Sequence, residues 1–231
     1  MSKHMPTNSN HNSLIEILQR SQELDVAITD LLDPETYRTF DDSERMTASF
    51  AACSVSLEHA RGLRMLLHEG LPTSAVSLMR PQYEALTRSV WLLYAASDTA
   101  VEKLQTPLTL ASEKSANGLP SLSDMLGAID GKAPPAATQM LTQFKDVTWR
   151  ALNSFIHGGI HPLQRHIEGY PSPLLIDIVR NSNGLLTASG MMLAILSGNS
   201  DIAKRMSKIQ YAFLDCLPIE AAYNNRGRTD F

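Results

Sequence analysis

Apolar residues recur at intervals of three and four along most of this chain of 231 residues, which is the spacing of helices with one buried face. The first predicted helix follows an N-cap at Asn12 or Ser13 and stops at an Asp-Pro pair. Its buried face consists of Leu14, Ile17, Leu18, Leu24, Ile28 and Leu31. The second predicted helix starts near Asp42 or Ser43 and ends at Glu69, where Gly-Leu-Pro follows.

The third predicted helix, about residues 73–96, carries charges close to a strongly apolar half. Its second half is apolar nearly all round, which predicts a central helix surrounded by others. Pro81 either kinks this helix or marks a fresh start. Arg80, Glu84 and Arg88 stand at successive four-residue steps, so that a carboxylate lies between two guanidiniums. This arrangement is typical of charges in poorly hydrated places, and it serves either a structural network or a site.

Residues 97–135 interrupt the pattern, because proline and glycine cut it into short pieces. One short helix is expected within 119–129. Further helices are expected at about 135–157, 172–197 and 201–217, with an irregular stretch at 160–173. The sequence has no strand-like alternation, glycine-rich nucleotide loop or internal repeat. The predicted fold class is therefore all-α, an up-and-down helical bundle with a long irregular connection in the middle.

The composition adds limits on organisation and location. We expect one helical domain at 13–218, a disordered N-terminal segment at 1–12 and a polar tail at 219–231. A net charge of −4 gives no general attraction to nucleic acid. Cys53 and Cys216 lie in apolar helical patterns, which predicts buried free thiols in a reducing compartment. No apolar run is long enough for a membrane span and no signal peptide is evident, so we expect a cytoplasmic protein without membrane contact.

A row of polar residues is the main candidate for chemistry. Arg150, Asn153, Ser154 and His157 occupy one stripe of the predicted helix that ends at Gly158-Gly159. Apolar residues cover its other side, so the element is amphipathic. An ordinary solvated helix carries such a row too, and periodicity alone leaves both interpretations open.

This row has the groups that metal-independent RNA cleavage requires. The reaction needs a group that takes the ribose 2′-hydroxyl proton or gives one to the leaving 5′-oxygen, and a cation for the charge on phosphate. Histidine suits the first task because it exchanges protons near neutral pH. Arginine suits the second because it is permanently charged and its planar fork matches phosphate oxygens.

Two segments carry a resemblance to a known group of proteins. Arg150, six intervening residues and His157 look like the Arg-x(4–6)-His motif of the HEPN (higher eukaryotes and prokaryotes nucleotide-binding) superfamily. The segment from Arg80 to Arg88, followed by an apolar helix and later by Ser-Phe-Ile-His-Gly-Gly, resembles uncharacterised bacterial HEPN-like helical families. The resemblance covers roughly residues 43–196.

The resemblance implies a HEPN-like bundle and a metal-independent endoribonuclease of the toxin or defence type, with the motifs of two subunits meeting in a homodimer. RNA or a nucleotide and an antitoxin are the implied partners. By position, Arg150 would bind phosphate, His157 would act as acid or base, and Asn153 would orient the substrate or the imidazole. The predicted supporting residues are Arg80, Glu84, Arg88, Ser154 and His161. Many HEPN-like proteins lack catalysis, so the alternative is a non-catalytic module that binds a nucleotide, RNA or protein partner.

A metal site is a weaker alternative. His157, His161 and His166, with Glu168, are spaced loosely enough to converge on zinc. Gly-Gly and a proline interrupt the helix that would fix the first pair at one-turn spacing, so isolated surface or capping histidines are the preferred interpretation. We therefore expect no metal and no cofactor.

Overall fold

The computed structural model describes residues 8–33, 35–107, 109–110, 112, 114 and 118–218. Within these ranges the regular structure is helical and contains no strand, which confirms the all-α class. No helix in the described ranges is long and apolar enough to cross a lipid bilayer. The helices are α1 (Asn8–Leu31), α2 (Glu44–His68), α3 (Pro72–Ser77), α4 (Met79–Tyr94), α5 (Asp98–Gln105), α7 (Leu122–Ile129), α8 (Pro135–Ile156), α9 (Ile160–Glu168), α10 (Ser172–Leu196) and α11 (Ser200–Ala212), followed by the 3-10 turn η1 (Leu214–Cys216).

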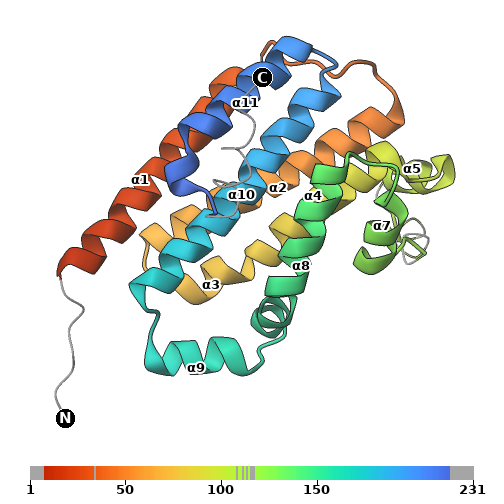
Figure 1. Ribbon diagram of the computed structural model, residues 1–231. Helices are drawn as coiled ribbons and strands as arrows, with labels where there is room; N and C mark the ends of the chain where they lie inside the picture. Colours follow the sequence, from red (N-terminus) through yellow and green to blue (C-terminus); the bar gives the residue numbers. More distant parts are fainter. Residues whose placement is uncertain are drawn as a thin grey trace.

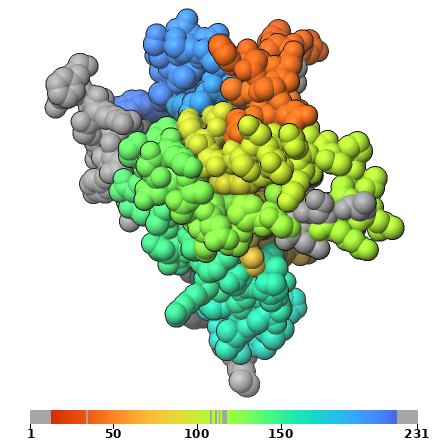
Figure 2. Space-filling view, turned by 90° about the vertical axis from the view of Figure 1, so that its right-hand side faces the viewer, coloured from red at the N-terminus to blue at the C-terminus, as the bar shows by residue number. Residues whose placement is uncertain are grey.

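Two helices form the centre of the bundle. Helix α10 packs against α1, α2, α4 and α11, and α4 packs against α2, α3, α7, α8 and α10 (Figure 1). Helix α8 lies on the side of α4 away from α1, and α9 crosses the end of the bundle between α8 and α10. The teal atoms of α9 project at the lower end of the face shown in Figure 2. Helix α4 is thus surrounded by other helices, as its apolar second half predicts.

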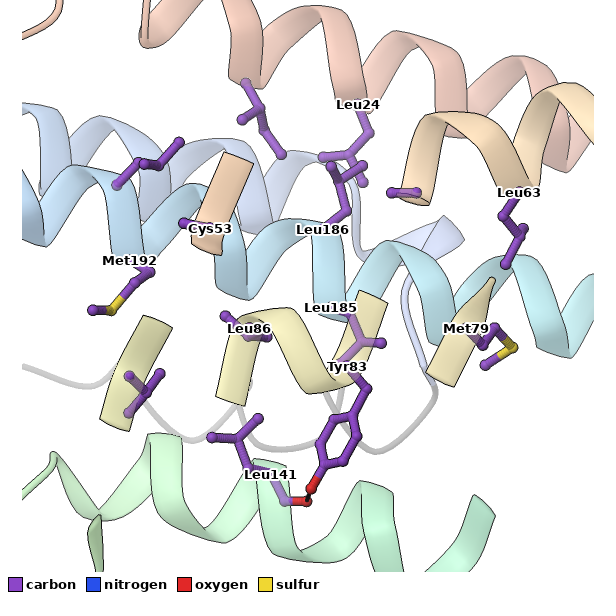
Figure 3. Close-up of a cluster of buried hydrophobic side chains, with 14 of the residues drawn as sticks. Leu24, Cys53, Leu63, Met79, Tyr83, Leu86, Leu141, Leu185, Leu186 and Met192 are labelled. Carbon is purple, nitrogen blue, oxygen red and sulfur yellow. Dashed lines mark hydrogen bonds between the residues drawn. The ribbon is translucent and has the colours of Figure 1, made fainter. Parts of the chain in front are cut away.

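The core joins side chains from every long helix. Tyr83 and Leu141 connect α4 to α8, because the Tyr83 hydroxyl donates a hydrogen bond of 2.8 Å to the Leu141 carbonyl oxygen (Figure 3). Both predicted thiols, Cys53 and Cys216, are buried and free. Of the first helix's predicted buried face, all members but Leu14 are buried, and Leu14 packs partly buried against the core.

Most predicted boundaries of long helices agree with the structure. Ser43 caps α2 by accepting a hydrogen bond from the Met46 amide. The predicted helix 73–96 is two helices, because the chain breaks at Leu78 and α4 begins at Met79. Pro81 is the third residue of α4, where a helix leaves its amide groups without intrahelical partners, so proline is tolerated there. Pro81 therefore lies in the first turn of a new helix, which is the second of the two predicted alternatives.

Three expectations need correction or qualification. The connection 97–135 holds α5 as well as the expected short helix α7, because Ser97 and Ser121 each cap a helix with their side chains. The stretch 160–173 is mainly helical, as α9, so the prediction of an irregular segment was wrong. Helix α1 begins at Asn8, ahead of the expected N-cap. The rest of the expected disordered segment, residues 1–7, and the expected tail at 219–231 lie outside the described residues.

An ion network between α1 and α2 was not predicted. Asp25 is 7% exposed at its side chain and accepts hydrogen bonds from Arg64 Nη2 at 2.6 Å and Arg61 Nε at 3.0 Å. Arg64 also donates to Gln22, and its side chain is 9% exposed. Two buried charges are therefore paired and hydrogen-bonded, which is the condition under which they survive in a core.

We predict that Asp25→Ala lowers the free energy of unfolding by about 3–5 kcal/mol, because it leaves the Arg64 guanidinium buried without its carboxylate. Urea unfolding followed by circular dichroism measures the change. Asp201→Ala is the matched control, because its ion pair with Lys204 is solvent-exposed and contributes little. Equal losses in the two variants would contradict a stabilising role for the Asp25 network.

Candidate functional site

Two members of the predicted polar row, Asn153 and His157, meet Arg80 at the junction of α4 and α8. Arg80 is the second residue of α4, and its side chain reaches across to the last turns of α8. Asn153 lies in the last turn of α8 and His157, its C-cap residue, follows one turn later, so both face the same guanidinium. Arg80 Nη1 donates a hydrogen bond of 2.6 Å to Asn153 Oδ1 and lies 3.4 Å from His157 Nε2.

Two further side chains fix the orientation of Arg80. Its Nε donates to Glu84 Oε1 at 2.8 Å, one turn further along α4. Its Cζ lies 4.6 Å from the centre of the Trp149 ring, a cation-π contact with the turn of α8 before Asn153. The Arg80 side chain is 19% exposed and that of Glu84 is 35% exposed. The guanidinium is therefore held by contacts from both helices and only partly hydrated.

In the described residues no hydrogen bond or ion pair joins Arg150 to His157, the two residues that the sequence predicts to act together. Arg150 is exposed on α8 and makes no hydrogen bond, ion pair or ring contact with the described residues. Arg88 is half-buried and likewise has no such partner in the described ranges, so only the Arg80–Glu84 part of the expected Arg-Glu-Arg network forms. The cation beside His157 is Arg80, one of the predicted supporting residues.

Ser154 points away from this cluster and shapes the turn into α9. Its Oγ accepts a hydrogen bond of 3.0 Å from the His161 amide, which supplies a cap that Gly159 cannot. Gly158 adopts a positive φ of 63°, and the Gly159 amide donates to the Ser154 carbonyl at 2.8 Å, the hydrogen bond of a Schellman C-cap. A Cβ on Gly159 would come within 2.5 Å of Ser154 Oγ. Ser154 therefore has a structural role, and only the backbone of His161 takes part.

Tyr83 holds α8 against α4 next to the site, and its role was not predicted from the sequence. Its ring stacks on Phe144 with the centres 4.7 Å apart, and burial raises the pKa of its hydroxyl to about 12. Together with the hydrogen bond to Leu141, this stacking keeps α8 against α4. A buried tyrosine needs a partner for its hydroxyl, but no spacing rule indicates which carbonyl accepts it.

Other chemistries find little support in the described part of the chain. No three His, Cys, Asp or Glu side chains there converge closely enough to hold a metal ion, and this includes the zinc alternative at His157, His161, His166 and Glu168. Burial raises the pKa of Cys53 to about 12 and that of Cys216 to about 11. Neither thiol is therefore ready to act as a nucleophile at neutral pH.

Comparison with known proteins places the chain in a family. The family model described as "Family of unknown function (DUF6988)" matches residues 53–219, which include α4, α8 and the whole Arg80 cluster. The chain belongs to this family. No curated protein and no solved structure matches it. Membership of this family therefore assigns no activity to the chain.

We predict that Gly159→Ala destabilises the fold by about 1–3 kcal/mol, because the added methyl group overlaps Ser154 Oγ and displaces the cap of α9. Thermal unfolding measures this effect. Gly127→Ala is the matched control, because no atom lies within 4 Å of its added Cβ and alanine favours the helical state of α7. A Gly159→Ala protein as stable as the control would show that the close approach of Ser154 is unimportant.

Proposed function

We propose that the protein is a metal-independent endoribonuclease whose active centre lies where α4 meets α8. The observation that carries this proposal is the position of His157, which has Nε2 3.4 Å from the Arg80 guanidinium with Asn153 bound to the same nitrogen. A group that transfers protons, a fixed cation and a polar amide then meet at one surface. The HEPN resemblance supports the same chemistry and assigns the phosphate contact to Arg150.

In this reaction the ribose 2′-oxygen bonds to phosphorus as the bond from phosphorus to the 5′-oxygen breaks. The 2′-hydroxyl loses its proton and the 5′-oxygen gains one, so the products are a 2′,3′-cyclic phosphate and a 5′-hydroxyl. His157 carries out one of the two proton transfers, and solvent completes the other. The Arg80 guanidinium beside His157 stabilises the charge that develops on the phosphate oxygens.

The proposal extends to a cytoplasmic toxin or defence effector that acts as a homodimer and is held inactive by an antitoxin. The exposed apolar side of α9 supports a protein contact next to the site. Ile160, Leu163 and Ile167 share one face of this helix and are 67%, 59% and 78% exposed. Three large apolar side chains on one face of a short helix are typical of a surface that is covered in an assembly.

A second candidate function is a non-catalytic module that binds RNA or a nucleotide through the same surface. The favouring observation is that Arg80 already has Glu84, Asn153 and Trp149 as partners. An arginine held in this way can bind phosphate tightly without any proton transfer. The two functions share the ligand and differ in whether His157 reacts.

The test is incubation of the purified protein with RNA in EDTA. We predict cleavage to 2′,3′-cyclic phosphate and 5′-hydroxyl ends, with a loss of at least about 100-fold in rate for His157→Ala, since general acid-base groups contribute about 10²–10⁴-fold. His68→Ala is the matched control, an exposed histidine at the end of α2.

Cleavage that survives His157→Ala would exclude the proposed mechanism. RNA binding without cleavage by the unaltered protein would establish the non-catalytic function instead. Circular dichroism of each variant separates a loss of chemistry from a loss of fold.

A further inference from the structure

We propose that Arg80, and not Arg150, binds the phosphate group of the ligand beside His157, with Glu84 and Trp149 as its positioning residues. This inference rests on the proposed function, because it names the phosphate-binding group of that same site. The ligand class is a phosphate ester, as found in the RNA backbone or a nucleotide. Three properties distinguish Arg80 from Arg150.

The first property is the fixed orientation of the Arg80 side chain. Arg80 is held at Nε by Glu84, at Nη1 by Asn153 and across its plane by Trp149. A free arginine side chain loses considerable rotamer entropy when it binds an anion, and a pre-ordered one loses less. Arg150 is exposed and has no such contact with the described residues, so it would have to be ordered by the ligand itself.

The second property is a hydrogen-bond donor of Arg80 that remains available to a ligand. Arg80 Nη2 makes no hydrogen bond to the described residues, yet it is not among the buried side-chain atoms that lack a partner. It must therefore reach solvent, and it can donate to an incoming oxygen while Nε and Nη1 keep their protein partners. A charged donor in a partly desolvated place gives a stronger hydrogen bond to phosphate than one in open water.

The third property is the proximity of Arg80 to His157, the reacting group. Arg80 Nη1 lies 3.4 Å from His157 Nε2, whereas no hydrogen bond, ion pair or ring contact joins Arg150 to His157 in the described chain. A phosphate oxygen bound to the free edge of Arg80 thus lies close to the imidazole. Among the described residues, Glu84 is the one carboxylate that pairs with Arg80, and it binds Nε, so Nη2 remains available to an anion.

The test uses an RNA oligonucleotide with 2′-O-methyl groups, which cannot be cleaved because its 2′-oxygen has no proton to lose. Fluorescence anisotropy gives its affinity for the unaltered protein and for Arg80→Gln, Arg80→Lys and Arg150→Gln. We expect both Arg80 variants to bind at least about tenfold more weakly, which corresponds to one charge-assisted hydrogen bond, and Arg150→Gln to bind within about threefold of the unaltered protein. Arg80→Lys keeps the charge and the aliphatic stem, so weaker binding by this variant would come from loss of the planar guanidinium and not from loss of the fold.

A second readout follows the imidazole directly. We expect inorganic phosphate to shift the ring NMR signals of His157 in the unaltered protein and in Arg150→Gln, but not in Arg80→Gln. Loss of binding in Arg150→Gln with retention in both Arg80 variants overturns the inference, and the proposed ribonuclease then stands or falls on its own cleavage assay. Arg80-dependent binding without RNA cleavage supports the inference and overturns the proposed catalysis. Absence of binding by the unaltered protein overturns both.

Discussion

The hydrogen-bonded contact of α4 with α2 and α10 is the constraint on which the rest of the structure depends. Gln82 donates to the Ser182 carbonyl and accepts from the Ser182 hydroxyl, at 2.9 and 2.8 Å. Two turns later, Ser89 donates to the Ser49 carbonyl at 2.8 Å. All these side chains are buried. The short serine side chains let the helices approach closely, and their hydroxyl groups still have hydrogen-bond partners. One face of α4 is thereby fixed, and its opposite face must carry Arg80 and Tyr83 toward α8.

That fixed orientation explains how an ordered arginine can exist at the site. Tyr83 anchors α8 through its hydroxyl and its stacked ring, so the distance between the helices does not depend on the polar cluster. Arg80 then meets Asn153 and His157 at the end of α8. The helix ends at Ile156 with His157 as its C-cap residue, because Gly158 adopts a left-handed conformation and Ser154 caps α9. Core packing therefore sets the geometry, and the site makes use of it.

How much of this could be predicted depends on whether the cause is local. Helix α2 could be placed because Ser43 and a glycine-proline break mark its ends, and the buried thiols could be placed because their neighbours are apolar. Helix α9 was missed because its cap comes from Ser154, in the preceding helix and before a Gly-Gly pair that indicates irregular chain. The Asp25 network was missed for the same reason, since Asp25 and Arg64 are 39 positions apart and no spacing rule connects them.

The candidate site shows the same limit within a single helix. Periodicity correctly places Asn153 and His157 on one stripe of α8, but it cannot say which edge of that stripe meets another helix. The structure divides the polar row by its neighbours, since Asn153 and His157 turn toward Arg80, Ser154 turns toward α9, and Arg150 remains in solvent.

This division also bears on the chemistry that the site can perform. The Arg80 guanidinium lies 3.4 Å from His157 Nε2. By Coulomb's law, a positive charge at this distance repels a metal cation from the nitrogen and attracts an anion, even where the site is partly hydrated. Asn153 adds a neutral amide, and the carboxylate of Glu84 is engaged on the far atom of the guanidinium. Phosphate is therefore a better match than a divalent metal to the residues that α4 and α8 place side by side.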